Sequence, residues 1–314
     1  MTAETSVYLG DALAAYGFGK GHPFSPRRYT AFKQAFEATS FAARCRIESP
    51  VSADVAQLIS FHTRDYVRRV QAQSKLGQGY LDYGDTPAFR GVFEAATTVV
   101  GTTLDATRRI MEGDCRRAFV PIAGLHHAAR DMAAGFCVFN DCGVAIEYLR
   151  RDYGLRKVAY VDIDAHHGDG VFYAFEGDPG VIIADLHQDG RTLYPGTGYA
   201  SETGTGEASG TKLNIPMPPG AGDHLFMSAW EKVEQFLNAQ RPEFILLQCG
   251  ADSIAGDPIT AMAYSAASYS HAATRLRAFA DQHCEGRLLA MGGGGYNLEN
   301  IASGWTAVVA KLVK

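Results

Sequence analysis

Residues Lys157–Gly170 read KVAYVDIDAHHGDG, and this stretch decides how the rest of the chain is interpreted. Its first half is a short run of apolar and β-branched residues, which is typical of a buried strand. Its second half changes at once to carboxylates, imidazoles and glycines. The change indicates that the strand ends at a polar edge where chemistry takes place.

Three more short apolar runs also end in polar or glycine-rich residues: Gly180–Leu186, Glu243–Cys249 and Arg287–Met291. They lead into DLHQDG, CGADS and MGGGGYN. Helical spacing of apolar residues predicts helices over Ser52–Ser74, Val92–Met111, Val144–Asp152, Asp223–Ala239, Thr260–His283 and Leu298–Val313. Such alternation predicts one α/β domain over residues 1–314, with a largely parallel central sheet flanked by helices on both faces. Sheets of this kind place ligands beyond the carboxyl ends of their strands.

Composition excludes several classes of protein. The 314 residues are 46% hydrophobic and 20% charged, which suits a globular chain with a sizeable core. The net charge of −5 offers no basic field, so nucleic acid is not an expected partner. No stretch approaches the roughly 18 apolar residues that span a bilayer, and the start does not resemble a secretory signal, so no membrane partner is expected. The six cysteines form no C-x-x-C pair, which favours reduced thiols in the cytoplasm.

A metal site is predicted where the first strand runs out. Asp162, Asp164 and His166 stand two residues apart, which puts them on one side of an extended chain. Crowded carboxylates and an imidazole favour a shared cation, and these donors suit zinc or another first-row divalent ion. A catalytic zinc needs three protein ligands, and Asp252, past another strand, is the natural third. A second catalytic metal would need a carboxylate two residues after His166, where the chain has Gly168, so one metal is expected.

Taken alone, the D-x-D-x-H run also fits a polar strand-to-helix turn with a capping aspartate. Two adjacent histidines strengthen the catalytic reading. His126 and His127 follow a glycine turn in PIAGLHHAARD. Imidazole titrates in the range that a base for water and an acid for a leaving amine require. Asp162 and Asp169 are spare carboxylates that would orient the two rings.

The run MGGGGYN ends in Tyr296, which would project toward the same edge. Its phenol would stabilise an oxyanion that develops on a carbonyl. A phosphate-binding glycine loop is the alternative, but neither G-K-[ST] nor G-x-G-x-x-G in the right context is present.

With HH, DxDxHHGDG, GADxxxGDP and GGGGY in this order, the chain resembles the histone deacetylase superfamily. It is most similar to bacterial deacetylase-like and acetoin-utilisation-type amidohydrolases. The resemblance runs from GFGKGHPFSPRR near the amino end to the last expected helix, and it implies an arginase/deacetylase-like fold. It also implies one catalytic zinc on Asp164, His166 and Asp252.

The resemblance further implies catalytic roles for His126, His127, Tyr296, Asp162 and Asp169. It implies a narrow channel for an alkyl-amine arm, lined by Gly135, Phe136, Tyr194 and Ile259, with His187 as a further wall candidate. Core packing is the alternative role for the two aromatic residues. Asp85 falls where the family has an acidic rim residue that grips substrate backbone. Arg28 matches a basic residue behind the metal that deals with acetate.

The family also carries one or two structural monovalent cations, usually potassium. The first would be held by Asp162, Asp164, His166, Asp185 and Leu186. Members commonly have serine where this chain has Asp185, and the extra carboxylate puts the usual ligation in doubt. A second cation would lie near Phe175 and Val181.

The implied reaction is zinc-dependent removal of an acetyl group from an acetyl-lysine side chain of a protein or peptide, with release of acetate. The alternative substrate is a small acetylated amine such as an acetylpolyamine. Enzymes of that kind tend to carry a long insertion, and the Leu76–Phe89 region is short. A non-catalytic reader of acetylated ligands would be expected to lack a metal ligand or the tyrosine, and here all are present.

Overall fold

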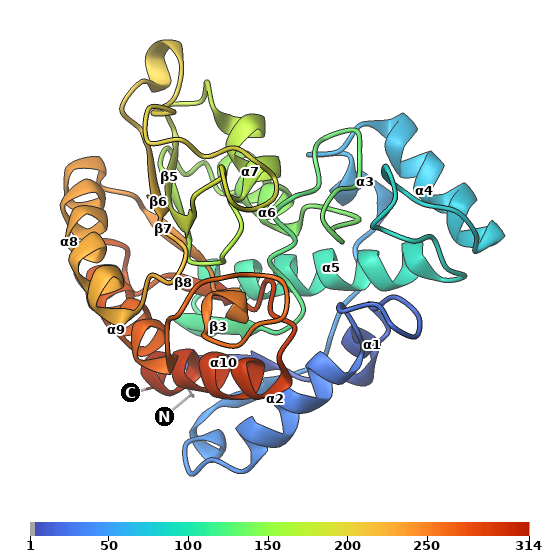
Figure 1. Ribbon diagram of the computed structural model, residues 1–314, viewed down its shortest axis with the longest axis horizontal. Coiled ribbons are helices and arrows are strands. Elements are labelled where there is room, and N and C mark those ends of the chain that lie inside the picture. Colours follow the sequence, from blue (N-terminus) through green and yellow to red (C-terminus); the bar gives the residue numbers. More distant parts are fainter. Residues whose placement is uncertain (1–3, 314) are drawn as a thin grey trace.

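An eight-stranded sheet runs through the middle of the molecule, and every pair of neighbouring strands in it is parallel (Figure 1). The computed structural model describes residues 4–313. Across the sheet the order is β2-β1-β3-β8-β7-β4-β5-β6. The strands are β1 (Thr5–Tyr8), β2 (Arg46–Glu48), β3 (Arg117–Val120), β4 (Val158–Asp162), β5 (Val181–Gln188), β6 (Lys212–Met217), β7 (Phe244–Gln248) and β8 (Leu288–Met291). The predicted α/β fold with a largely parallel sheet is therefore confirmed.

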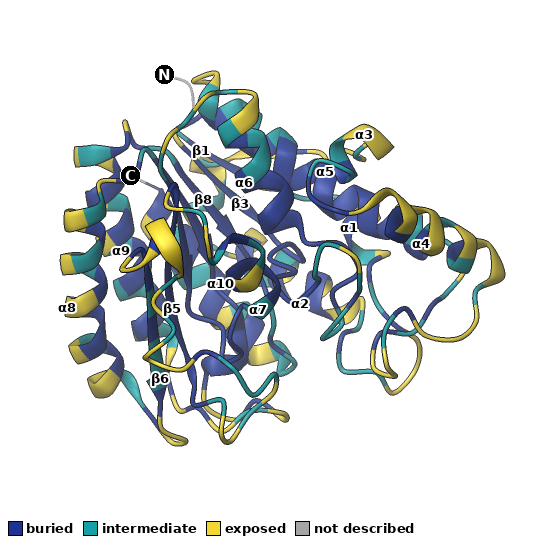
Figure 2. Cartoon of the chain, turned by 90° about the horizontal axis from the view of Figure 1, so that it is seen from above, coloured by how far each residue is buried: buried dark blue, intermediate teal, exposed yellow. Residues whose placement is uncertain are grey.

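Helices cover both faces of this sheet (Figure 1). One layer contains α2 (Arg27–Glu37), α8 (Asp223–Gln240), α9 (Ala266–His283) and α10 (Leu298–Leu312). The other contains α5 (Val92–Met111) and α6 (Asp141–Arg151), and α1 (Asp11–Ala14) and α4 (Arg64–Leu76) pack on α5. Two short helices, α3 (Val55–Leu58) and α7 (Asp169–Phe175), complete the set. Figure 2 shows buried strands between helices whose outer faces are exposed, as on α8.

The prediction of one continuous helix over Ser52–Ser74 is wrong. The range Ser52–Ser74 contains two helices, because two separate capping signals interrupt the apolar spacing. Asp54 and Gln57 cap α3 reciprocally, each side chain accepting the other's backbone N–H. The side chain of Thr63 caps α4, and its own N–H donates to the carbonyl of Arg130 at 2.7 Å. Two starts within 23 residues rule out one straight helix.

Two other helices begin at a cap rather than at the first apolar residue. The helix expected from Val144 starts at Asp141, because Asn140 accepts the N–H of Gly143. The helix expected from Thr260 starts at Ala266, because Ser265 caps it. The helix predicted over Val92–Met111 is confirmed without a shift.

The strand order explains how distant motifs meet. The four strands with polar ends, β8, β7, β4 and β5, are consecutive neighbours in the sheet. Strand β3, whose following loop carries the histidine pair, lies beside β8. All five are parallel, so their carboxyl ends share one edge. No helix in the described part of the chain is long and apolar enough to cross a membrane.

Candidate active site

A buried cluster at the carboxyl ends of β4 and β7 has the donors of a metal site. Ligand atoms of Asp164, His166 and Asp252 all lie within 4.8 Å of one another. His166 Nδ1 is 3.1 Å from Asp164 Oδ1 and 3.3 Å from Asp252 Oδ2. Within residues 4–313, no other group of His, Cys, Asp or Glu side chains meets this spacing.

The residues around this cluster fit a bound cation. Oδ2 of Asp252 is buried and has no hydrogen-bond partner, while its other oxygen accepts the N–H of Ala165 at 2.9 Å. The pKa of Asp252 is raised to about 7, because the carboxyl group is buried and because the nearby carboxylate of Asp164 repels its charged form. A Cβ at Gly294 would lie 2.1 Å from Asp252 Oδ2, and one at Gly250 would lie 1.9 Å from Asp164 Oδ2. Glycine at both positions leaves room for the carboxylates to meet, and oxygen and imidazole donors suit zinc.

A glutamine that the sequence did not single out also holds the cluster. Gln248, the last residue of β7, donates from Nε2 to Asp164 Oδ2 at 2.9 Å and accepts the N–H of Gly250 at 2.7 Å. A buried amide with partners on both its atoms fixes the aspartate rotamer. Its signal was a polar residue at the end of an apolar strand.

The histidine pair lies on a loop that two buried side chains at the start of α6 hold in place. The carboxylate of Asp141 accepts the N–H groups of Gly124 and Leu125. The amide of Asn140 donates to the carbonyl of His126 at 3.3 Å. Neither residue was expected from the sequence, although Asn followed by Asp is a common helix start.

The two imidazoles face each other, and each is held by its own carboxylate. His126 Nε2 and His127 Nε2 lie 3.1 Å apart. Nδ1 of His126 is 2.8 Å from Asp162 Oδ2, and Nδ1 of His127 is 2.6 Å from Asp169 Oδ1. Tyr160 donates from its hydroxyl to Asp162 at 2.5 Å, which fixes that carboxylate in turn. The pairing predicted from the sequence is present.

Their surroundings drive the two imidazoles toward opposite protonation states. Burial alone lowers the pKa of both. At His126 the carboxylates of Asp162 and Asp164 outweigh burial and raise the pKa to about 10. At His127 the charge of His126 adds to burial, and the pKa falls to about 4 although Asp169 opposes the change. The pKa values of the two imidazoles are therefore shifted in opposite directions.

A small cavity connects these groups. Its wall includes both histidines, Asp164, His166 and Tyr296. Burial and the nearby Asp252 raise the pKa of Tyr296, so its phenol keeps its proton. The arrangement places the possible metal ligands, two carboxylate-held imidazoles and a phenol hydroxyl around one space.

Three of the residues expected to line a channel, Gly135, Phe136 and Tyr194, lie in the wall of this cavity or against it. The ring of Tyr194 is 5.2 Å from His127, and the ring of Phe136 is 5.8 Å from Tyr296. Gly135 belongs to the cavity wall. Tyr194 is 45% exposed and Ile259 is 39% exposed, so both reach the surface and neither is an ordinary core residue.

His187 does not line the channel, contrary to expectation. It is fully buried, with Nδ1 2.7 Å from Asp185 Oδ1 and Nε2 2.9 Å from the carbonyl oxygen of Gly198. The other oxygen of Asp185 accepts the N–H of Gly168 at 2.9 Å. His187 thus serves as the counter-charge to the unexpected carboxylate of Asp185.

Asp85 lies in an exposed turn that is attached to the channel. The carboxylate of Asp82 accepts the N–H groups of Asp85 and Thr86 at 3.1 and 3.0 Å. Oγ1 of Thr86 in turn accepts the N–H of Phe136 at 3.1 Å. The turn therefore has a defined position beside the aromatic wall.

Arg28 is buried behind Tyr296. It donates from Nε to the carbonyl of Gly295 at 2.7 Å and from Nη2 to the carbonyl of Gly293 at 2.5 Å. Its guanidinium carbon lies 5.6 Å from the ring of Tyr296. Nη1 is buried without a hydrogen-bond partner, so one donor of a buried cation is free.

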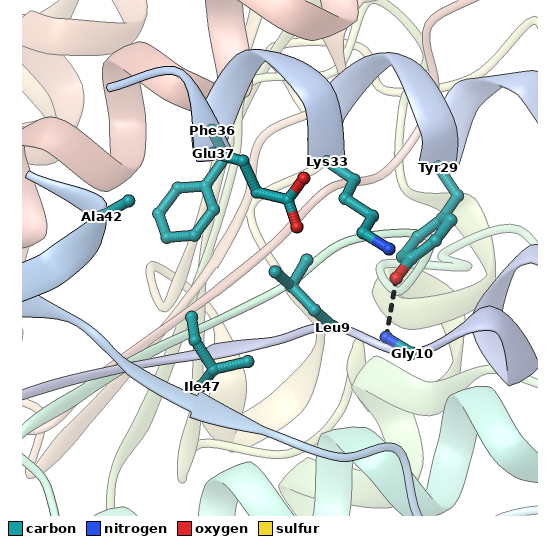
Figure 3. A pocket seen from close by; sticks show the side chains of 8 residues that line it. All are labelled: Leu9, Gly10, Tyr29, Lys33, Phe36, Glu37, Ala42 and Ile47. Atoms are coloured by element: carbon teal, nitrogen blue, oxygen red, sulfur yellow. Dashed lines mark hydrogen bonds between the residues drawn. The ribbon is translucent and has the colours of Figure 1, made fainter. Parts of the chain in front are cut away.

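A larger hollow lies elsewhere, between α2, the edge strand β2 and the residues that follow β1 (Figure 3). Its lining includes Leu9, Phe36 and Ile47. The hydroxyl of Tyr29 accepts the N–H of Gly10 there at 2.7 Å. The hollow contains none of the metal ligands and no paired histidines, so the chemistry belongs to the smaller cavity.

The parallel sheet gathers two aspartates and a histidine that could hold a metal ion beside two carboxylate-held imidazoles, which is an arrangement typical of hydrolases. Comparison with known proteins gives the family. Residues 22–312 match the histone deacetylase domain, so the chain belongs to the histone deacetylase family.

Individual relatives agree with this assignment. The chain is 36% identical over 302 residues to the acetoin utilization protein AcuC of Bacillus subtilis, covering 93% of this chain and 78% of that protein. It is 33% identical over 296 residues to histone deacetylase 8 of Danio rerio, covering 92% and 76%. The crystal structure of the HDA15 HD domain superposes with a TM-score of 0.91 at 30% identity, covering 99% of this chain and 89% of that one. The family supports a deacetylase.

Proposed function

We propose that the protein is a zinc-dependent deacetylase that hydrolyses the acetyl amide of an acetylated lysine side chain in a protein or peptide. One observation carries the proposal. The cavity that reaches Asp164 and His166 is also walled by the His126–His127 pair and Tyr296. Hydrolysis of an amide needs a base, an acid and an oxyanion donor around one carbon, and this wall offers all three.

The zinc ion would be held by Asp164, His166 and Asp252. When bound with a position left open, it lowers the pKa of a water molecule and polarises a carbonyl group. Three protein ligands are the number that catalytic zinc sites use. The buried, unpartnered Oδ2 of Asp252 supports this assignment.

His127 would take a proton from the attacking water. Its Nδ1 lies 2.6 Å from Asp169, so Nδ1 carries the hydrogen and Nε2 is left as the acceptor. His126, held by Asp162, would return a proton to the leaving amine, with the two rings sharing the transfer across 3.1 Å. Both carboxylates act by orienting the rings and stabilising their charged forms.

Tyr296 would donate its O–H to the oxyanion as the carbonyl carbon becomes tetrahedral. The loss of one such donor typically costs about 3 kcal/mol of transition-state stabilisation. Arg28, with its free Nη1, would receive the acetate that is released behind the tyrosine. A buried guanidinium is suited to a carboxylate product.

The alkyl arm of the substrate would pass between Gly135, Phe136 and Tyr194, with Ile259 at the mouth. Aromatic walls bind methylene groups without needing polar partners. Asp85, on its exposed turn, would accept a backbone N–H of the substrate. These positions support an extended acetyl-lysine as the proposed substrate.

We further propose that potassium binds near Asp162, Asp164, His166, Asp185 and Leu186. In the described chain the carbonyl oxygens of Asp164 and His166 accept no hydrogen bond. Potassium prefers such oxygens, and the charge of Asp185 is already balanced by His187 at 2.7 Å. The departure from serine therefore adds a buried ion pair to this site.

The alternative substrate is a small acetylated amine such as an acetylpolyamine. The region that would carry a narrowing insertion is a short turn, closed by a bridge between Tyr80 and Pro87. This short turn supports the longer peptide as the preferred substrate. All six cysteines are free thiols, which supports a reducing compartment such as the cytoplasm.

The experiment is a panel of acetyl-lysine peptides, free acetyl-lysine and acetylpolyamines, assayed for acetate release with zinc-loaded protein. We expect peptides to give the highest kcat/KM. Tyr296→Phe, loaded equally with zinc, is the matched background control. Comparable inactivity on every substrate in a zinc-loaded sample would defeat the deacetylase assignment. A higher kcat/KM for acetylpolyamines than for peptides would show that the substrate is a small acetylated amine.

A further inference from the structure

The turn between α7 and β5 holds a lysine where the family resemblance places a second monovalent cation. The cation was expected near Phe175 and Val181. The ammonium of Lys212, the first residue of β6, lies there instead. Its Nζ is 2.6 Å from the carbonyl oxygen of Val181 and 2.9 Å from that of Asp178.

All three N–H donors of this ammonium have an acceptor. The third is Oγ1 of Thr211, at 2.8 Å. That hydroxyl donates its own hydrogen to the carbonyl of Ala208 at 2.7 Å, so a lone pair is directed at the lysine. Lys212 is only 2% exposed, which means that its charge rests on these oxygens rather than on water.

The position of Lys212 follows from the sheet. It pairs with Ile183 at the open edge, where β6 begins. Its side chain runs from there toward the amino end of β5. The carboxylate of Asp178 forms an ion pair with Arg150, and it acts on the ammonium of Lys212 through its charge and not through a hydrogen bond. The hydrogen bonds of the lysine all go to backbone and hydroxyl oxygens.

A lysine ammonium and a potassium ion both bind a small set of oxygen atoms with partial negative charge. They cannot share the carbonyl of Val181, because two unit charges at contact distance repel strongly. Burial lowers the pKa of Lys212 to about 8, so the side chain remains charged near neutral pH. The residues present here do not fit an added ion.

We propose that the Lys212 ammonium replaces the second monovalent cation, so that this chain needs no potassium at the α7–β5 turn. Because the ammonium of Lys212 is part of the chain, it stays at this position whatever the potassium concentration. It ties the carboxyl end of α7 to the sheet, and the amino end of the same helix carries Asp169, the partner of His127. The inference concerns only these contacts and holds whatever substrate the enzyme uses.

The test is the thermal unfolding midpoint of Lys212→Ala, measured near neutral pH in potassium chloride and in choline chloride of equal ionic strength. Alanine removes the ammonium and leaves the three oxygens with an open space. In choline we expect the midpoint to fall by about 6 °C, because three charge-assisted hydrogen bonds are lost. In potassium we expect most of that loss to be recovered, and by more than any potassium effect on the unchanged protein.

Two controls make the result specific. Lys157→Ala removes a half-buried lysine that donates to a single carbonyl, that of Gln240 at 2.8 Å, so it should respond to potassium as the unchanged protein does. Lys212→Met removes the charge but fills the space, so potassium should not restore it. An equal potassium response in Lys212→Ala and the unchanged protein would refute the proposal.

Crystals soaked in rubidium give a second measurement that does not depend on the variant folding. Anomalous density beside the carbonyl oxygens of Asp178 and Val181 in the unchanged protein would show that an ion binds despite the lysine, and would overturn the inference. Absence of density there, with density in Lys212→Ala, supports it.

Discussion

The Nε2 atoms of His126 and His127 lie 3.1 Å apart, although the two rings are held by different carboxylates on different sides. The contact requires at least one of the two nitrogens to carry a hydrogen. The carboxylates of Asp162 and Asp164 favour the proton on His126, and the resulting charge disfavours a second proton on His127. The pair is thus asymmetric before any substrate arrives.

Asp169→Asn should make His127 a poorer base, and it should leave the metal ligands unchanged. The amide keeps the shape of the carboxylate but removes the charge that orients the ring at 2.6 Å. We expect kcat/KM to fall about 100-fold with zinc content unchanged. Steady-state kinetics and metal analysis check this, with Asp65→Asn, on an exposed helix position, as the control. Unaltered kcat/KM would remove Asp169 from the mechanism.

Tyr296→Phe should abolish most turnover and keep the metal. The phenol is not among the metal-binding side chains, and its hydroxyl is proposed to act only on the oxyanion. We expect kcat to fall about 100-fold or more, with little change in substrate binding. The control is Tyr83→Phe, because Tyr83 is 95% exposed. If the Tyr296 variant instead loses its zinc, the assigned role is wrong.

Gly294→Ala should lower zinc affinity in a protein that still folds. A Cβ at this position would lie 2.1 Å from Asp252 Oδ2, so the carboxylate must move away from Asp164 and His166. We expect the zinc dissociation constant to rise about 10-fold or more in a chelator competition assay. Gly19→Ala is the matched control, since a Cβ there meets nothing within 4 Å. Equal affinities in both variants would contradict the fit of the site.

His62 should contribute to acid sensitivity of the fold. Burial lowers its pKa to about 3, and its Nε2 accepts the N–H of Asn140 at 2.9 Å, which requires the neutral ring. Below about pH 6.5 the unfolded chain binds a proton at this histidine and the folded chain does not, so stability is lost as pH falls from there toward 3. The loss is about 1.4 kcal/mol for each pH unit.

The measurement is the free energy of unfolding in urea at several pH values between neutral and mildly acid. His62→Gln should show a smaller slope against pH than the unchanged protein, whatever its absolute stability. His224→Gln, at an exposed position, should keep the full slope. A slope that is the same in all three proteins would show that another group governs the acid response.

The sequence predicted those parts of the fold that depend on local patterns. Four strands are buried, nearly continuous apolar runs that end in polar or glycine-rich residues, which are rare in a hydrophobic core: β4, β5, β7 and β8. Strands β1, β2, β3 and β6 were not predicted. Three of these lie at or next to an edge of the sheet, and β6 contains Lys212 and Pro216, which conceal its strand character. Pairing with distant neighbours makes these segments strands.

The same limit applies to the site. The spacing of Asp164 and His166 was enough to expect a metal ligand pair, and the structure places Asp252 beside them. Gln248, Asn140 and the Asp185–His187 pair were not assigned as supports, because their partners are backbone groups or charges far away in the sequence. The spacing of residues within one segment can predict which ligands that segment offers. It cannot predict which N–H group from a distant segment will need an acceptor.

The parallel sheet has a consequence for how the protein matures. The N–H of Ala165 donates to Asp252 across a separation of 87 residues, and that bond exists only after β7 has inserted between β4 and β8. Contacts of such long range form slowly and late. The complete set of proposed zinc ligands therefore forms only when folding is complete, and a nascent chain released before β7 would offer only Asp164 and His166.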